Sequence, residues 1–102
     1  MNEPALTLLV RFKSRLTFEE VMNVMEERAP EFRALTGLHQ KYYLQDADSG
    51  EFAGLYLWES QEALASYRES ELRASIAEAY QADGEPRVEV CRVIKTLRDD
   101  AA

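Results

Sequence analysis

The sequence predicts an α+β fold in which one antiparallel sheet of four strands carries two helices on a single face. Three observations support this: segments in which apolar residues alternate along a strand, two segments with apolar residues at helical spacing, and the order β-α-β-β-α-β in which they occur. This order, with a central hairpin and right-handed crossovers, is typical of the ferredoxin-like arrangement. The 102 residues are expected to form one domain, with an ordered core over about residues 5–97.

The first strand and the first helix occupy the N-terminal third of the chain. Apolar side chains at every second position predict the strand over residues 5–13. Thr17 and Glu20 then form a capping box, which predicts the first turn of a helix. We expect Pro30 to kink or break this helix, with a further turn beyond it, and Gly37 to close it as a C-cap.

An aromatic-rich hairpin and a second helix follow. The segment DADSGE joins the two hairpin strands, and Gly50 can supply the positive φ that a tight turn needs. Ser60 is expected to cap the second helix, and Ser70 to cap a second piece of it. The three remaining strands are expected over residues 38–46, 52–59 and 87–97.

Composition excludes several classes of partner and site. The net charge of −7 repels phosphate backbones and anionic lipids, so we expect no nucleic-acid and no membrane partner. The N-terminal segment resembles neither a signal peptide nor a membrane span. Cys91 is expected to be a small, reduced, packed side chain, and these features together predict a cytoplasmic protein. We expect no metal site and no nucleotide cofactor, because the chain has one histidine, one cysteine and no glycine-rich phosphate loop.

Several strands are apolar on both faces. Leu9, Leu55 and Leu57 fall on the face opposite to the one that the helices can cover. An extended apolar face of this kind needs its own cover. A second copy of the chain, packed sheet against sheet about a two-fold axis, would provide it. We therefore predict a homodimer through the open sheet face.

Three short motifs in the middle of the chain form a known pattern: GL at 37–38, YLWES at 56–60 and EAL at 62–64. With the strand order, they resemble the dimeric α+β barrel superfamily, which includes the antibiotic-biosynthesis monooxygenases. The segments FEEVMNVMEERAPEFRALTGLHQKYY at 18–43 and LYLWESQEALASYRESEL at 55–72 are most similar to the YdhR-type monooxygenases. The resemblance covers about residues 6–97 and implies a dimeric barrel.

The resemblance also implies a chemistry. Members that are enzymes oxidise aromatic polyketide-like compounds with dioxygen and without metal or flavin, because the carbanion of the substrate activates the oxygen. Trp58 matches a tryptophan that lines the pocket in both the polyketide and the heme-degrading branches. The heme branch adds a histidine on the second helix and an asparagine on the first strand, and this chain has neither, so heme degradation is not expected. The polyketide branch uses an asparagine near the tryptophan, whereas the asparagines here are Asn2 and Asn23.

The aromatic residues of the hairpin are the main candidates for a binding site. A hairpin with Ala47 opposite Glu51 would make Tyr42 face Tyr56 on one side of the sheet. With Tyr67 from the second helix, these rings would wall a flat, largely apolar pocket. The alternative is that they only fill the core, in which case their buried hydroxyls still need hydrogen-bond partners.

His39 and two strand arginines are the candidates for acid–base and anion-binding roles. His39 would lie on the opposite side of its strand, either as a surface or interface residue or as a general base for a phenolic proton. Arg11 and Arg92 are charges within apolar strands and could anchor an anionic substrate. The alternative for both arginines is an ion pair with Glu89 or with a carboxylate of a partner chain.

The leading functional prediction is a cofactor-independent monooxygenase that oxidises a small aromatic or polyphenolic compound with dioxygen. A prediction from a different class is a non-catalytic ligand-binding or stress-associated barrel protein that uses the same cavity. A third is a purely structural dimer with a filled interior. In the first, His39 or a tyrosine assists deprotonation, and the pocket and substrate contacts come from Trp58, Tyr42, Tyr56, Tyr67, Tyr43, Arg11 and Arg92.

Overall fold

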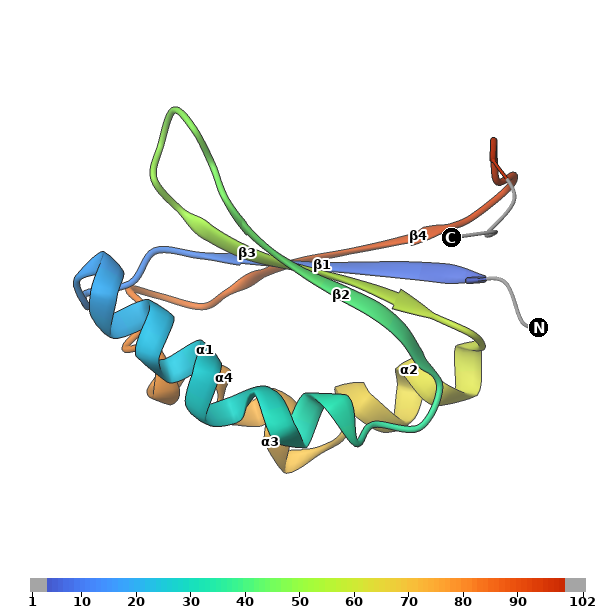
Figure 1. Ribbon diagram of the computed structural model, residues 1–102, viewed down its shortest axis with the longest axis horizontal. Coiled ribbons are helices and arrows are strands. Elements are labelled where there is room, and N and C mark those ends of the chain that lie inside the picture. The colour runs from blue at the N-terminus through green and yellow to red at the C-terminus, as the bar shows by residue number, and fades with distance from the viewer. Residues whose placement is uncertain (1–3, 99–102) are drawn as a thin grey trace.

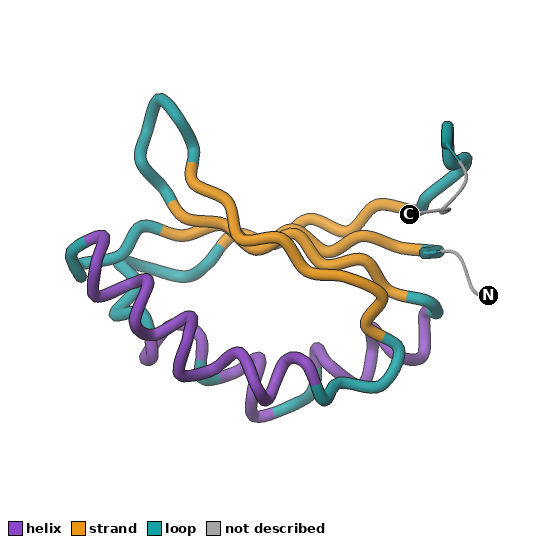
Figure 2. Tube along the Cα trace, viewed as in Figure 1, coloured by secondary structure: helices purple, strands orange, loops and turns teal. Residues whose placement is uncertain are grey.

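The computed structural model describes residues 4–98. Its elements are β1 (Leu6–Phe12), α1 (Phe18–Arg33), β2 (Leu38–Gln45), β3 (Phe52–Trp58), α2 (Gln61–Arg68), α3 (Glu71–Ala74), α4 (Ile76–Ala79) and β4 (Arg87–Arg92). The strands form one sheet in the order β2-β3-β1-β4, and each neighbouring pair is antiparallel. All the helices lie on one face of this sheet and the other face is open (Figures 1 and 2). The predicted ferredoxin-like α+β class is therefore confirmed.

Helix α1 begins where the capping box predicts. The backbone N–H of Thr17 donates to Glu20 Oε1 (2.8 Å), and the N–H of Glu20 donates to Thr17 Oγ1 (3.2 Å). These two bonds satisfy N–H groups that the first turn of a helix leaves without partners.

The end of α1 differs in two details from the prediction. Pro30 lies inside a continuous helix that runs to Arg33, so a break at this residue is wrong, although the further turn is present. A proline in the last turn removes one backbone hydrogen bond, and the remaining bonds hold the turn. The C-cap is Ala34, and Gly37 acts later, in the connection to β2, with a φ of +84°.

The turn between β2 and β3 sets a register one residue away from the predicted one. Asp46, rather than Ala47, lies opposite Glu51, because the Asp46 N–H donates to the Glu51 carbonyl (2.8 Å). The Asp46 carboxylate accepts from the backbone N–H groups of Asp48 (2.8 Å) and Ser49 (2.9 Å), which fixes the loop. Gly50 completes it with the expected positive φ of +78°.

A β-bulge near the start of β2 changes which side chains face the helices. Leu38 pairs with Trp58 and Gln40 pairs with Leu57, so His39 is an extra residue in the strand. Beyond the bulge, Lys41 pairs with Tyr56. Leu38 packs against the buried core, and the Lys41 side chain reaches the ring of Phe32 on α1, so both point to the helix side.

The second helical segment is divided as predicted. Ser60 Oγ accepts from the N–H of Ala63 (3.1 Å) at the start of α2, and Ser70 Oγ accepts from the N–H of Arg73 (3.1 Å) at the start of α3. The segment is divided once more than predicted, because α4 follows α3 as a third short helix.

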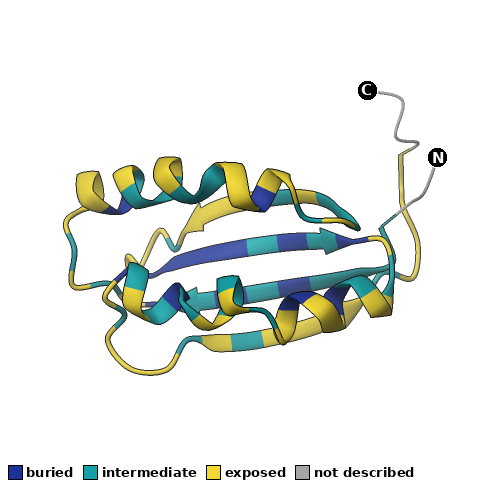
Figure 3. Cartoon of the chain, turned by 90° about the horizontal axis from the view of Figure 1, so that it is seen from below, coloured by how far each residue is buried: buried dark blue, intermediate teal, exposed yellow. Residues whose placement is uncertain are grey.

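The core lies between the helices and the two central strands (Figure 3). Alternate residues of β1 and β3 point into it, and Leu8 and Trp58 are fully buried. The buried apolar residues are Leu8, Val10, Phe12, Val21, Phe32, Phe52, Ala53, Tyr56, Trp58, Leu64, Tyr67, Ile76 and Tyr80. Among the described residues, no helix has the length and apolar character needed to cross a membrane.

The open face of the sheet carries a group of apolar side chains, with charged residues such as Glu89 and Arg11 beside it. Leu9, Leu55 and Leu57 are only partly covered there, and Tyr42 and Leu44 are 51% and 42% exposed. Cys91 is a free, exposed thiol, so the prediction of a packed side chain is wrong. The reason is that β4 is an edge strand, and Cys91 pairs with Thr7 on β1.

Candidate functional site

Four aromatic side chains meet between the helices and the sheet: Phe32 of α1, Tyr56 and Trp58 of β3, and Tyr67 of α2. We call them the aromatic cluster. The rings of Tyr56 and Trp58 are nearly parallel, and the Tyr67 ring lies 5.2 Å from each of them. The Tyr67 hydroxyl donates to the Tyr56 hydroxyl (3.1 Å). Trp58 Nε1 is buried without a hydrogen-bond partner in the structure, which is unusual for a polar atom in a core.

Lys41 brings an amine to this cluster from β2. Its Nζ lies 3.5 Å from the ring centre of Phe32, 4.4 Å from that of Tyr43 and 4.5 Å from that of Tyr56. Burial, with a smaller contribution from the nearby Arg28 guanidinium, lowers the pKa of Lys41 from 10.5 to about 7. The neutral amine of Lys41 is therefore accessible near neutral pH, unlike that of an ordinary lysine.

Arg28 of α1 is the second cation of this layer. Its Nη2 donates to the Leu72 carbonyl (3.1 Å) and to Ser75 Oγ (3.2 Å), which ties α1 to α3. Its guanidinium lies 5.7 Å from the ring centre of Phe32 and 6.0 Å from that of Tyr80. Arg28 Nε, like the tryptophan N–H, is buried without a partner in the structure.

The tyrosines around these cations stay protonated at physiological pH. Burial raises the pKa of Tyr80 to about 12 and raises the pKa of Tyr56 well above its ordinary value. The pKa values of Tyr67 and Tyr43 are also raised, again mainly by burial. These phenols can donate hydrogen bonds, but they are poor proton acceptors in this layer.

Two pockets and one small cavity border the aromatic cluster. The α1–β2 pocket, of about 380 Å³, is lined by Ala29, Phe32, Arg33, Leu38, His39, Gln40, Lys41 and Tyr43. The α2 pocket, of about 440 Å³, has Trp58, Tyr67, Ser66 of α2 and the two cap residues Ser60 and Ser70 in its wall. The inner cavity, of about 20 Å³, lies deeper, and Lys41 and Tyr43 line both it and the α1–β2 pocket. Both pockets are within the size range of small-molecule sites.

The structure brings together some of the predicted site residues. Tyr56, Trp58 and Tyr67 are in mutual contact, as expected. Tyr42 pairs with Leu55 and lies on the open face, so the prediction that it faces Tyr56 is wrong. The cause is the one-residue shift at Asp46, which reverses the facing of every residue of β2 between the bulge and the turn.

The same shift determines where the other hairpin candidates lie. Tyr43 is on the helix side, with its ring against the Lys41 amine. His39, at the bulge, lines the α1–β2 pocket. Lys41 was missed by the sequence prediction, because the predicted register pointed it away from Tyr56. An available signal was its position as a charge directly before two tyrosines in a strand that must pack against a helix.

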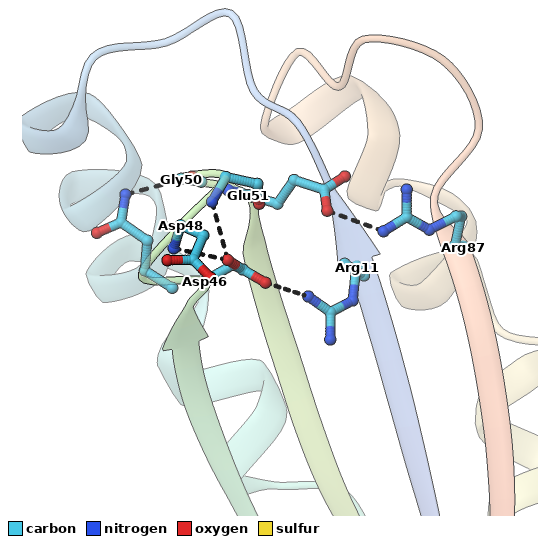
Figure 4. A network of polar contacts seen from close by, with 8 residues as sticks. Arg11, Asp46, Asp48, Gly50, Glu51 and Arg87 are labelled. Atoms are coloured by element: carbon cyan, nitrogen blue, oxygen red, sulfur yellow. Dashed lines mark hydrogen bonds and ion pairs between the residues drawn. The ribbon is translucent and has the colours of Figure 1, made fainter.

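Arg11 and Arg92 do not join the aromatic cluster. Arg11 Nη1 forms an ion pair with Asp46 Oδ2 (3.1 Å), so the alternative that it is paired with an acid holds for Arg11, with Asp46 rather than Glu89 as the partner. Figure 4 shows this pair in a network at the hairpin end of the sheet, beside a second ion pair between Arg87 and Glu51 (2.8 Å). Arg92 is exposed and pairs with Leu6 at the other end of β1, about five residue pairs away, or roughly 17 Å.

The Asp46 carboxylate is the centre of that network. Backbone N–H groups of Ser49 and Asp48 lower the pKa of Asp46, and Arg11 adds to this effect. The network therefore supports the turn and the register rather than forming a free anion-binding site. Within residues 4–98, no group of three histidine, cysteine or acidic side chains is placed to bind a metal ion.

Comparison with known proteins gives one family match. The model of the family described as "Putative mono-oxygenase ydhR" matches residues 7–84 of the chain. This segment contains the aromatic cluster, Lys41 and both pockets. No curated protein shows a significant sequence match.

Several solved structures share the fold at low sequence identity. A protein of unknown function from Nitrosomonas europaea is 13% identical with a TM-score of 0.77, and the match covers 99% of this chain and 100% of that chain. SnoaB, a cofactor-independent oxygenase from Streptomyces nogalater, is 16% identical with a TM-score of 0.73, over 95% of this chain and 100% of that chain. A protein from Caulobacter crescentus described as a "putative antibiotic biosynthesis monooxygenase" is 15% identical with a TM-score of 0.73, over 91% and 92% of the two chains.

Proposed function

The chain belongs to the family described as "Putative mono-oxygenase ydhR", and from this premise we propose that it is a cofactor-independent monooxygenase for a small aromatic or polyphenolic compound. The substrate would lie against the aromatic cluster, in one of the two pockets that border it. The likeness to SnoaB supports the fold on which this chemistry is known, at an identity that says nothing about the substrate.

The proposed reaction needs only dioxygen and a substrate carbon that carries two hydrogens between hydroxylated rings. Removal of one proton leaves a carbanion, which passes one electron to dioxygen, and the two radicals join in a carbon–oxygen bond. The resulting peroxide takes up a proton, loses its second carbon-bound proton and splits its oxygen–oxygen bond. The products are a carbonyl and one water, so four electrons leave the carbon and four reduce dioxygen.

The observation that carries this proposal is the set of buried polar atoms around the aromatic cluster. Trp58 Nε1 and Arg28 Nε have no hydrogen-bond partners in the structure, although both are buried. A core that serves only packing rarely leaves such donors unsatisfied, because each costs on the order of 1–3 kcal/mol. A hydroxylated ring bound in this layer would offer oxygen acceptors to them and apolar surface to the rings.

Oxygen uptake tests the proposal. We expect the purified protein, without added cofactor, to consume one dioxygen per carbonyl formed from a hydroxylated anthrone such as 1,8-dihydroxyanthrone, whose methylene carbon lies between two hydroxylated rings. Trp58→Phe keeps an aromatic side chain but removes the five-membered ring with its N–H, and it should lower the rate by at least about tenfold, the effect of one hydrogen bond of about 1.4 kcal/mol. Phe18→Leu is the control, because Phe18 lies at the start of α1 and is 55% exposed.

A different outcome would favour the alternative function. Tight binding of hydroxyarenes without any oxygen uptake would contradict the monooxygenase proposal and support a non-catalytic ligand-binding protein. Retention of the full rate in Trp58→Phe would show that the tryptophan N–H has no part in the reaction.

We also propose that the protein is a homodimer through the open sheet face. The exposed Tyr42 and Leu44 continue the partly covered Leu9, Leu55 and Leu57 across this face. Leu44→Lys should give a folded monomer, because a charge cannot be buried between two sheets without a partner. Native mass spectrometry measures this, with an expected dimer of twice 11.7 kDa for the unaltered chain. Lysine at the exposed Ala65 of α2 should leave the dimer intact, and a monomeric unaltered chain would contradict the proposal.

A further inference from the structure

The position of Lys41 is unusual for a lysine. Three aromatic rings surround its Nζ at 3.5 to 4.5 Å from their centres. No carboxylate of the described residues forms an ion pair with it. The charged group that affects its pKa is another cation, Arg28. A lysine buried only for packing would ordinarily keep its ammonium in water or pair it with an acid.

The local sequence creates room for this arrangement. The bulge at His39 and the register fixed by Asp46 turn Lys41 inward beside Tyr56. Gly54 lies next to it on β3, and a Cβ there would be 3.3 Å from Lys41 Cε and 3.0 Å from Tyr56 Cε1. The absence of a side chain at this position therefore accommodates both groups.

Lys41 also stands between the α1–β2 pocket and the inner cavity, since its side chain lines both. The amine is thus within reach of a ligand in the pocket while its surroundings remain mostly apolar. A neutral amine in such a place can accept a proton, and the resulting ammonium can stabilise the anion that is formed.

We infer that Lys41 is the general base of this protein, and that its Nζ takes the acidic O–H or C–H proton of a hydroxylated aromatic compound seated in the α1–β2 pocket. The inference rests on the proposed function for the oxidation that follows, but the proton transfer itself needs no oxygen. The proton moves to Nζ, the electron pair stays on the ligand, and the ligand becomes a phenolate or carbanion beside the new ammonium.

The charged and titratable groups around Lys41 favour this assignment over the tyrosines. From α1 it faces Arg28, and the α1 charges Arg33 and Glu26 act on its neighbour Tyr43. The groups from the sheet are Tyr43 and His39 of β2 and Tyr56 of β3, with Tyr67 and Tyr80 beyond them. Every one of these tyrosines has a raised pKa and holds its proton at neutral pH. The lowered pKa of Lys41, about 7, makes its amine available in the same range. Arg28 then adds positive charge that favours an anionic ligand.

An anaerobic titration tests the proton transfer without any turnover. The probe is 4-nitrophenol, whose phenolate is yellow and whose neutral form is not. Bound to the unaltered protein, its ionisation midpoint should fall below that of the free probe. In Lys41→Met the midpoint should rise by about one pH unit or more relative to the unaltered protein, a tenfold change in ionisation. Lys95→Met, at an exposed lysine outside the sheet, is the matched control and should titrate as the unaltered protein does.

Oxygen uptake with the same variants separates a base from a simple positive charge. Lys41→Arg keeps the charge but cannot accept a proton, so it should still favour the ionised probe and yet lose about a hundredfold or more in the rate of hydroxyarene oxidation. In the unaltered protein the rate should rise with pH to a plateau, with a midpoint near 7. Thermal unfolding of each variant shows whether it is folded.

The possible failures are distinguishable. If the bound probe is ionised in a way that depends on Lys41, but no hydroxyarene causes oxygen uptake, the inference is supported and the monooxygenase proposal is refuted. Oxygen uptake that is unchanged in Lys41→Arg would keep the monooxygenase and overturn the inference. If the probe loses its ionisation in His39→Gln but keeps it in Lys41→Met, the inference is overturned and His39 is the base. An unaltered protein that leaves the midpoint of the probe where it is in free solution would overturn it as well.

Discussion

Replacement of Gly37 by alanine is expected to lower the free energy of unfolding by about 2–4 kcal/mol. Two separate costs combine. Gly37 has a φ of +84°, a conformation that costs an L-residue about 1–2 kcal/mol. A Cβ at this position would also overlap the Cβ of Ala63 in the first turn of α2. The backbone cannot easily move away, because the Gly37 carbonyl accepts the Glu59 N–H (2.9 Å).

Two other glycines of the same chain separate these costs. Gly50 and Gly84 have φ values of +78° and +90°, and a Cβ at either would have no atom within 4 Å. Alanine at these positions should therefore show the conformational cost alone. Urea denaturation of the three variants measures the difference, and equal losses in Gly37→Ala and Gly50→Ala would contradict the predicted overlap.

A double-mutant cycle with Ala63→Gly gives a second measure. In the Gly37→Ala background, removal of the Ala63 methyl group should recover the stability that the overlap has cost. By itself, Ala63→Gly lowers the stability of a helix by about 1 kcal/mol. The two substitutions should therefore be strongly non-additive. Additive losses would show that the connection between α1 and β2 adjusts without pressing on α2.

Lys41→Met should stabilise the protein below pH 7 by about 3–4 kcal/mol, and this gain should disappear as the pH rises toward 10.5. The sign follows from the two pKa values. Between about 7 and 10.5 the unfolded chain still binds the Lys41 proton, whereas the folded chain has released it, so the stability of the unaltered protein rises with pH. Below pH 7 both states are charged, and the folded state carries the full cost of a buried ammonium. The three ring faces offset part of that cost.

The measurement is the difference in unfolding free energy between the variant and the unaltered protein across this pH range. Taking the difference removes the contributions of the other titrating groups that the two proteins share. Lys95→Met, at an exposed position, should show no such pH dependence. A difference for Lys41→Met that stays constant from pH 6 to pH 10 would contradict the lowered pKa. A more stable variant that has lost activity would be an instance of the usual conflict between stability and function.

The architecture could be predicted from the sequence because its signals are local. The capping box at Thr17, the serine caps at Ser60 and Ser70 and the alternation along β1 each depend on a few neighbouring residues. The aromatic cluster was partly predictable for the same reason, since Tyr56, Trp58 and Tyr67 occupy the inward positions of well-defined elements.

The inner face of β2 could not be predicted, because it depends on the turn that follows the strand. The Asp46 carboxylate fixes the turn by accepting hydrogen bonds from the backbone N–H groups of Asp48 and Ser49. The resulting register points Lys41, rather than Tyr42, toward the helices. No periodicity within residues 38–45 reveals it, since both faces of the strand carry aromatic residues. The prediction that Cys91 is packed failed for a similar reason. Its exposure depends on the position of β4 at the edge of the sheet, and the strand order sets that position.

The extra residue at the start of β2 makes His39 a spacer between two rigid anchors. On one side the hairpin is held at Asp46, and on the other the chain is held where Gly37 meets Ala63. A chain without that spacer would keep Lys41 in place, since its register is counted back from the turn, and the missing length would have to come from the Gly37 connection. The position of an insertion or deletion in this strand therefore decides its effect. A change before residue 40 strains the connection at Gly37. A change between residue 40 and the turn moves the inward-facing side chains of β2 to its open face.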